Sequence, residues 1–312
     1  MTELDPQIQA VLDAMAAQPV PDEPPTIAEM RAGASAGHMA LCPPAVEMAE
    51  IATVNIGGPN GDVRCVVSTP RRTVERLPVL IWFHGGGLVL LGADEFQPVC
   101  TALAAGADCI VVNVDYRLAP EHPFPQPLDD AVAVYRWCLE HAGEIGGDAA
   151  RIAVGGDSAG GYLATALCLD AKSLGLPQPV LQLLVYPDVD MANRSESMMT
   201  INAFIGFEQV AALHAAHCGD QVLNPRASPI HAADHRGLAP AFILAAGHDP
   251  LVDQGRAYAA VLRAAGVPVR YSCYQGTIHA FFTMGGAVDV ANVAVAEAAD
   301  ALAGAFTAAA AS

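Results

Sequence analysis

A serine in a short glycine-flanked segment is the first candidate for chemistry in this chain. Gly156-Asp157-Ser158-Ala159-Gly160 matches the G-x-S-x-G pattern, in which small flanking residues allow a serine to sit on a tight turn between a strand and a helix. Upstream, His84-Gly85-Gly86-Gly87 ends an apolar run, and such glycines can point backbone N–H groups at a developing oxyanion. Together the two patterns predict one site for acyl transfer. Its predicted oxyanion-hole donors are N–H groups of glycines 85–87, together with the N–H of Ala159.

Ser158 needs a base, because a serine hydroxyl is a weak nucleophile until a neighbouring group takes its proton. Among the ten histidines, His279 lies in a loop just after the last strand candidate, 267–274. His214 and His217 lie on an expected cap helix, where we predict that they face solvent or the cap interior. The histidines of polar loops are His122, His231 and His235. His279 is the predicted base, since it alone combines a loop position with the expected order along the chain.

Asp249 and Asp253 are the candidate carboxylates that would orient this base, because both follow the apolar segment 241–246. Asp249 is closer to the end of that segment, and Pro250 keeps its loop extended. We interpret Asp253 as the N-cap of a helix that begins at Gln254. The prediction is a catalytic triad of Ser158, Asp249 and His279, in a chain order that differs from those of chymotrypsin-like and subtilisin-like proteases.

Strands and helices alternate around these residues. An antiparallel hairpin is predicted for 51–56 and 63–68, joined by a glycine-rich turn. Near-continuous apolar runs, typical of parallel strands covered on both faces, follow at 79–83, 109–114, 152–154, 180–186, 241–246 and 267–274. Helical patterns occupy 94–105, 127–141, 159–173, 254–265 and 289–307. The alternation predicts an α/β fold: a mostly parallel eight-stranded sheet with an antiparallel N-terminal hairpin and helices on both faces.

Two segments outside this alternation are predicted to form a helical cap. Residues 1–45 contain two short helical patterns and are assigned to the N-terminal part of the cap. Residues 191–227 contain a helical stretch but no strong strand, and are assigned as the cap insertion. The catalytic domain then consists of residues 46–190 and 228–312.

The composition limits the partners of this 312-residue chain. Lys and Arg number 15 against 33 Asp and Glu, and the net charge of -18 disfavours nucleic acid and other polyanions. The eight cysteines include no C-x-x-C pair and no spacing typical of a zinc site, so we expect them to be reduced. The N-terminus is acidic and no apolar signal region follows it, which favours the cytoplasm and indicates no membrane anchor.

The motifs resemble those of the hormone-sensitive-lipase-like bacterial esterases, a group of the α/β-hydrolase superfamily. Beyond the serine and glycine segments, the resemblance includes Asp115 to Glu121, Tyr186-Pro187, the Asp-Pro-Leu-x-Asp of Asp249 to Asp253, and His279-Ala280-Phe281. It extends over about residues 45 to 305.

This resemblance implies an α/β-hydrolase fold and a serine carboxylesterase without a cofactor or metal. Ser158 would attack the ester, His279 would transfer the proton, and Asp249 would orient His279. The N–H groups of Gly85, Gly86 and Ala159 would hold the oxyanion. By analogy, neutral esters with short to medium acyl chains are the expected substrates, and a homodimer is possible. Two alternatives remain: an amidase or deacetylase that uses the same triad, and a non-catalytic receptor for small molecules. The natural ester is not determined by these residues.

Overall fold

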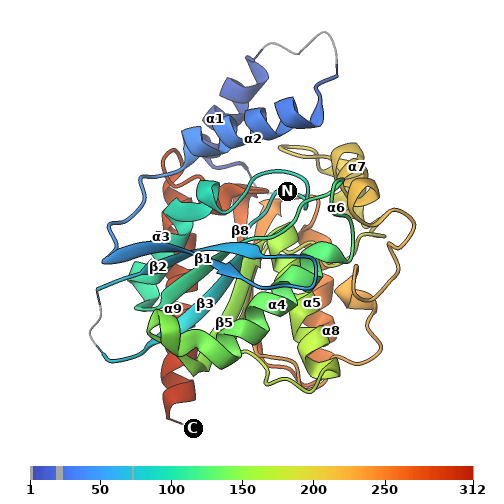
Figure 1. Cartoon of the computed structure of the whole chain (residues 1–312). Helices are drawn as coiled ribbons and strands as arrows, with labels where there is room; N and C mark the ends of the chain where they lie inside the picture. The colour runs from blue at the N-terminus through green and yellow to red at the C-terminus, as the bar shows by residue number, and fades with distance from the viewer. Residues whose placement is uncertain (1–2, 19–23, 72–73, 312) are drawn as a thin grey trace.

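A computed structural model of the chain describes residues 3–18, 24–71 and 74–311. Within these residues, eight strands form one mixed sheet in the order β1-β2-β4-β3-β5-β6-β7-β8 (Figure 1). The strands are β1 (Glu50–Ile56), β2 (Val63–Thr69), β3 (Leu77–Phe83), β4 (Ile110–Asp115), β5 (Gly147–Asp157), β6 (Gln182–Val185), β7 (Ala241–His248) and β8 (Val269–Ile278). β1 and β2 form the predicted antiparallel hairpin, β2 is also antiparallel to β4, and the other neighbouring strands are parallel. The predicted fold class is confirmed.

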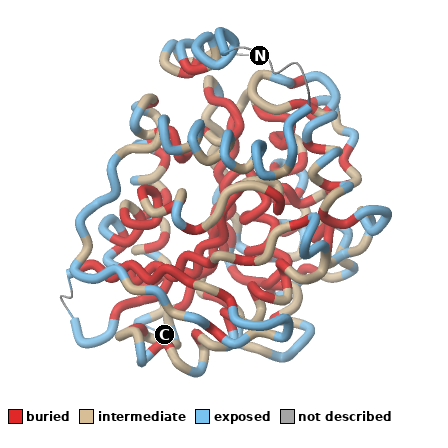
Figure 2. The backbone as a smooth tube through the Cα atoms, turned by 45° about the horizontal axis from the view of Figure 1, so that its top comes forward, coloured by how far each residue is buried: buried red, intermediate tan, exposed pale blue. Residues whose placement is uncertain are grey.

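Helices cover both faces of the sheet, because the central strands carry apolar side chains on both sides. The covering helices are α3 (Gln97–Ala107), α4 (Gln126–His141), α5 (Ala159–Ser173), α8 (Val252–Ala264) and α9 (Asp289–Ala310). Val79 and Ile81 of β3 belong to the core shared with α4, α5 and α8. Leu80 and Trp82 of the same strand belong to the core shared with α3 and α9. Figure 2 shows the buried residues concentrated along the sheet between these two layers.

α9 is long and apolar enough, by length and composition, to cross a membrane. Core helices of soluble proteins can have the same length and composition, so this property is weak evidence for a membrane span. In the structure, Ala294, Ala298 and Leu302 of α9 are buried in the core that also contains residues of α3. One face of α9 is therefore used in packing against the rest of the fold.

Two groups of helices lie at the carboxyl ends of the parallel strands (Figure 1). α1 (Pro6–Ala16) and α2 (Ile27–Leu41) come from the N-terminal segment, and α6 (Glu196–Thr200) and α7 (Phe207–Cys218) come from the segment between β6 and β7. Arg31 of α2 fastens the first group, because its guanidinium donates hydrogen bonds to the backbone oxygens of Val89 and Ala119. It also pairs with Glu121 at 2.6 Å. The N-terminal helices are thus joined to loops at the carboxyl edge of the sheet.

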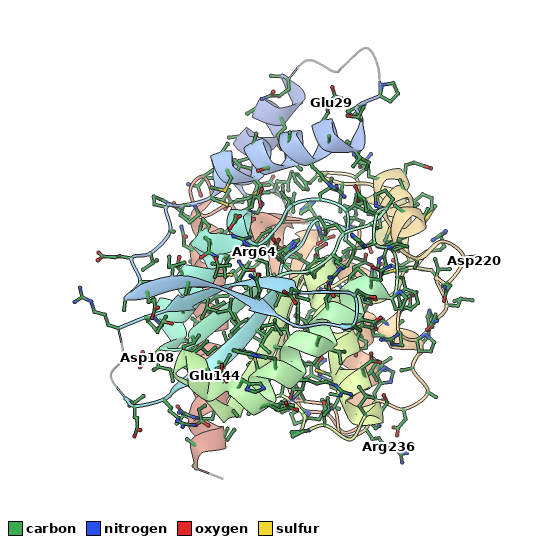
Figure 3. The ribbon with its side chains drawn as sticks, viewed as in Figure 1. Glu29, Arg64, Asp108, Glu144, Asp220 and Arg236 are labelled. Atoms are coloured by element: carbon green, nitrogen blue, oxygen red, sulfur yellow. The ribbon has the colours of Figure 1, made fainter. Side chains whose placement is uncertain are left out.

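Charged side chains lie mainly on the outside of the molecule. Glu144, Asp220 and Arg236 point outward from three different regions (Figure 3). Asp157 and Asp249 are exceptions, since both are buried. These buried carboxylates belong to the site described next.

Candidate active site

The sharp turn at Ser158 connects β5 to α5, as the sequence predicts. β5 ends at Asp157, α5 begins at Ala159, and Ser158 between them has φ +54° and ψ -118°. A Cβ atom at Gly160 would lie 1.8 Å from the Phe83 carbonyl oxygen, and one at Gly156 would lie 2.4 Å from the same atom. Both glycines are therefore required by the close approach of β3 to this turn. The turn holds Ser158 at the carboxyl edge of the sheet in a backbone conformation that non-glycine residues rarely adopt.

Ser158, His279 and Asp249 form one chain of hydrogen bonds, although they are far apart in the sequence. His279 directly follows β8, and its Nε2 lies 2.9 Å from Ser158 Oγ. Its Nδ1 lies 2.8 Å from Oδ2 of Asp249, which directly follows β7. Asp249 is fully buried, and its Oδ1 accepts the N–H of Leu251 at 2.8 Å. This arrangement can transfer the proton of a serine hydroxyl to an oriented imidazole.

Three buried carboxylates determine the electrostatic environment of His279. Burial alone would lower the pKa of His279, but Asp249, followed by Asp157 and Asp188, outweighs burial and raises that pKa above its usual value. The imidazolium that forms when His279 accepts a proton is therefore stabilised.

Asp253 lies close to this triad in sequence but not in function. α8 begins at Val252 with Leu251 at its N-cap, so our interpretation of Asp253 as the cap residue is wrong. Asp253 Oδ2 instead accepts the N–H of Ser197 at 3.0 Å, and this contact joins α6 to α8. A cap two residues earlier was not visible in the sequence, because Leu251 makes no side-chain hydrogen bond to the helix.

The glycine segment at the end of β3 is close to the nucleophile, but one of its predicted roles needs correction. The N–H of Gly85 donates to Asp157 Oδ1 at 2.9 Å, so it is not available to an oxyanion in this structure. Gly86 and Gly87 have φ +111° and +63°, and both line the same cavity as Ser158. Their N–H groups, together with that of Ala159 at the start of α5, are the candidate donors that remain. The pattern alone could not select among three consecutive glycines, because the choice depends on how the loop turns.

Asp157 and His84 hold this glycine segment in place. Burial raises the pKa of Asp157 to about 7, although nearby His279 and the Gly85 N–H oppose this shift. The His84 ring stacks on Tyr116 with ring centroids 4.2 Å apart, and Tyr116 Oη donates to the His84 carbonyl oxygen at 2.6 Å. Burial lowers the pKa of His84, which favours its neutral form. The sequence places Asp157 beside the nucleophile but gives no sign of the support from Tyr116.

A cavity of about 700 Å³ opens at Ser158 and His279. One wall is formed by α1 and α2, where Gly33 and Gly37 face open space. Another wall comes from the segment between β6 and β7, which contributes larger side chains. These are Phe204, Ile205, Val210 and Leu213. The lining is mainly apolar, as expected for a site that binds a neutral small molecule.

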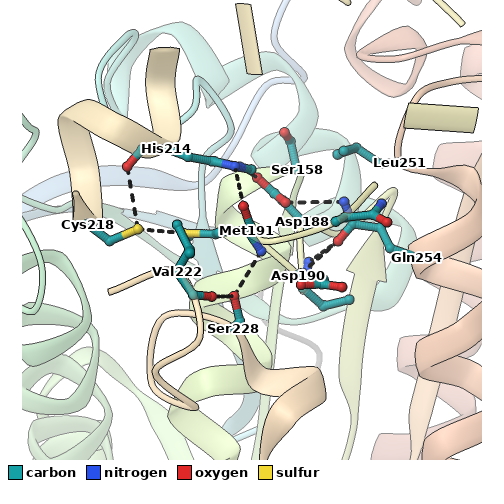
Figure 4. Close-up of polar contacts among 12 residues, drawn as sticks. Ser158, Asp188, Asp190, Met191, His214, Cys218, Val222, Ser228, Leu251 and Gln254 are labelled. Carbon is teal, nitrogen blue, oxygen red and sulfur yellow. Dashed lines mark hydrogen bonds and ion pairs between the residues drawn. The ribbon is translucent and has the colours of Figure 1, made fainter. Parts of the chain in front are cut away.

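His214 and Asp188 are two polar residues of the cavity to which the sequence gave no role at the site. His214 Nε2 lies 2.6 Å from Asp188 Oδ2, and both side chains line the cavity (Figure 4). His217, one turn away on α7, is buried between the rings of Phe124 and Tyr162. The prediction that these histidines face solvent or the cap interior is wrong for both, because His214 lines the cavity and His217 packs against rings of the catalytic domain. The available signal was the position of Asp188 just after the apolar run that ends at Tyr186.

Comparisons with known proteins point to one family. A family profile described as alpha/beta hydrolase fold matches residues 80–283. The chain is 40% identical over 247 residues to esterase LipI of Mycobacterium tuberculosis, and the match covers 77% of each protein. It is 39% identical over 225 residues to an ethyl acetate hydrolase of Pseudomonas putida, and this match covers 68% of the chain and 69% of the relative. A solved structure of ester-hydrolase EH1AB1, from the metagenome of Lake Arreo and in complex with a bipyridine phosphonate derivative, superposes with a TM-score of 0.92 at 36% identity, covering 97% of this chain and 99% of the other.

Proposed function

This chain belongs to the alpha/beta hydrolase fold family, in its hormone-sensitive-lipase-like branch, and is a carboxylic ester hydrolase; we propose that it cleaves short- to medium-chain esters through an acyl-enzyme on Ser158. The observation that carries the proposal is the unbroken chain of hydrogen bonds from Ser158 Oγ through His279 to Asp249. It lies at the base of an apolar cavity, where an ester can reach the hydroxyl.

Acylation begins when Ser158 Oγ attacks the ester carbonyl carbon and its proton moves to His279 Nε2. Asp249 accepts the Nδ1–H of His279, so that Nε2 is free to take this proton. The carbonyl oxygen becomes an oxyanion, which the N–H groups of Gly86, Gly87 and Ala159 bind. The positive end of α5 adds to this stabilisation, because Ala159 is its first residue. The intermediate then breaks its bond to the alcohol oxygen, and His279 returns the proton to the departing alcohol.

Deacylation repeats the same steps with water. His279 takes a proton from a water molecule as the water oxygen attacks the acyl carbon bound to Ser158 Oγ. The second tetrahedral oxyanion uses the same donors, and its collapse breaks the bond to Oγ. The proton on His279 returns to Ser158, and the carboxylic acid leaves.

The proposed substrate class follows from the cavity and from one relative. The lining suits an uncharged ester, because few polar groups are present to replace the hydration of a charged substrate. The ethyl acetate hydrolase of Pseudomonas putida is named for an ester with a short acyl chain. A cavity of about 700 Å³ also has room for chains of medium length.

The test is a series of p-nitrophenyl esters from acetate to palmitate, measured with the wild-type protein and with Ser158→Ala. We expect kcat/KM to be highest at short to medium length and to fall for the longest chains. Ser158→Ala should reduce turnover by a factor of about 10⁶, since it removes the nucleophile. Hydrolysis by Ser158→Ala at the wild-type rate would refute the acyl-enzyme on Ser158. A steady rise of kcat/KM toward palmitate would refute the proposed chain length.

A further inference from the structure

We propose that His214 and Asp188 form a positioning pair that holds the cap helix α7 against both catalytic loops, the one at Ser158 and the one at the glycine segment. The inference rests on the proposed hydrolysis at Ser158 and deepens it. Neither residue is a member of the triad or a candidate oxyanion donor. Both are almost completely buried, with side-chain exposures of 9% and 8%.

The contacts of His214 require a doubly protonated ring. Its Nε2 lies 2.6 Å from Asp188 Oδ2, and its Nδ1 lies 3.2 Å from the carbonyl oxygen of Met191 (Figure 4). A carbonyl oxygen only accepts hydrogen bonds, so Nδ1 carries a proton, and the carboxylate takes the proton on Nε2. Although burial opposes it, Asp188 raises the pKa of His214, and His214 in turn lowers the pKa of Asp188. The pair is therefore a charge-assisted contact between imidazolium and carboxylate.

Asp188 is rigidly connected to the nucleophile. Its backbone N–H donates to the carbonyl oxygen of Ser158 at 3.1 Å. Its Oδ1 accepts a hydrogen bond from Gln254 Nε2 of α8 at 3.3 Å. Gln254 Oε1 also accepts the N–H groups of Val189 and Asp190, each at 2.7 Å. The carboxylate that binds His214 thus belongs to the same fixed loop that supports the turn at Ser158.

The residue before His214 reaches the other catalytic loop. A Cβ atom at Gly87 would lie 2.5 Å from Leu213 Cδ1, so the Leu213 side chain sits directly on this glycine. Adjacent residues of α7 therefore contact the Ser158 loop through Asp188 and the glycine segment through Gly87. If the pair is lost, α7 keeps the hydrogen bond from the Phe124 N–H to the His217 carbonyl oxygen at 2.8 Å but loses its polar attachment to Asp188. Leu213 is then no longer held firmly over a candidate oxyanion donor. Misplacement of about 1 Å in such a site can reduce the rate about 100-fold.

Other titratable groups surround the pair and affect its charge. On α7 itself, His217 and Cys218 are buried beside His214. From the segment after β6, Arg194 opposes the positive charge of His214. From the loop after β8, the charge of His279 lowers the pKa of Asp188. Asp188 is the attractive partner among these groups, so His214 stays charged until the pH exceeds its raised pKa.

The experiment compares His214→Leu with a matched control, His231→Leu. His231 forms a similar pair with Asp190 at 3.0 Å, but it lies outside the cavity and its side chain is 37% exposed. Active sites are counted by titration with a p-nitrophenyl phosphonate, and kcat per titrated site is measured with p-nitrophenyl butyrate from pH 6 to 10. Counting sites removes the effect of misfolded protein, which is all that a merely structural role would change.

We expect His214→Leu to lower kcat per titrated site at least tenfold, whereas His231→Leu keeps the wild-type value. The wild type should also lose activity at alkaline pH as His214 deprotonates, and this loss should be absent from His214→Leu. Because a lone buried carboxylate can destabilise the fold, the double variant His214→Leu/Asp188→Asn is measured as well and should show the same loss of kcat. A wild-type kcat per titrated site in His214→Leu or in the double variant would overturn the positioning role. Failure of the phosphonate to label the wild type would instead refute the proposed function.

Discussion

Asp249→Asn offers a sharp test of how the triad works, because both carboxylate oxygens of Asp249 are already used. Oδ1 accepts the Leu251 N–H and Oδ2 faces His279 Nδ1, each at 2.8 Å. An asparagine has one oxygen and one NH2 group. If its oxygen keeps the Leu251 N–H, its NH2 group faces Nδ1. His279 must then carry its only proton on Nε2, where it cannot accept the proton of Ser158.

The magnitude follows from burial and from this tautomer. Asp249 is fully buried, so water cannot relieve the alternative orientation, in which the NH2 group faces the Leu251 N–H. The wrong tautomer of a triad histidine lowers kcat by a factor of about 10⁴ in an unrelated serine protease. At about 1.36 kcal/mol for each factor of ten, this corresponds to about 5.4 kcal/mol of transition-state stabilisation.

The assay is kcat for p-nitrophenyl butyrate, with the folded fraction checked by circular dichroism. Asp253→Asn is the control, because Asp253 lies in the first turn of α8, close to Asp249 in the sequence, but does not line the cavity. We expect a loss of about 10⁴ in kcat for Asp249→Asn and less than a threefold change for the control. A folded Asp249→Asn protein with kcat within tenfold of wild type would refute the role assigned to Asp249.

Three further predictions concern pH, the glycine segment and the cavity wall. His279 must be neutral to act as a base, and the nearby carboxylates raise its pKa, so kcat/KM should fall as the pH drops through a value above 6.5. Asp157→Asn removes one of these carboxylates and should move the fall to lower pH, which a pH profile of both proteins will show. Gly86→Ala should lower kcat by a factor of about 10² to 10³, because φ at this residue is +111° and the new Cβ would lie 2.2 Å from the Leu90 carbonyl oxygen. An unchanged kcat in steady-state assays would exclude Gly86 as an oxyanion donor. The variant Gly37→Leu should fold, since a Cβ atom at Gly37 meets nothing within 4 Å. It should lower kcat/KM for p-nitrophenyl octanoate about tenfold relative to p-nitrophenyl acetate, because Gly37 lines the cavity. Equal effects on both esters would show that α2 does not limit the space for the acyl chain.

The fold was predictable where the local pattern and the tertiary environment agree. β3 and β4 are apolar on both faces, and helices cover both of these faces in the structure. β5 was harder, because the predicted segment 152–154 is only part of Gly147–Asp157. Gly155 and Gly156 interrupt the apolar run, yet they belong to the strand because β6 pairs with them. Pairing with a distant strand is not visible in a local window.

The catalytic triad could be predicted because the order of the strands determines which loops converge. Loops at the carboxyl ends of neighbouring parallel strands converge, and Asp249 and His279 follow β7 and β8 directly. The contact of His214 with Asp188 could not be predicted in this way, because it depends on how α7 folds back over the sheet. The same reason applies to Gly85, whose N–H is directed by the loop conformation and not by the residue type.

The crowded turn at Ser158 also determines which positions of this enzyme can change during evolution or engineering. β3 passes so close that neither Gly156 nor Gly160 can gain a side chain without moving backbone atoms. Mutational libraries directed at the pentapeptide will therefore yield mostly inactive protein. The wall formed by α2 has the opposite property, because Gly33 and Gly37 border open space. Substrate preference can diversify there while the reaction centre remains unchanged.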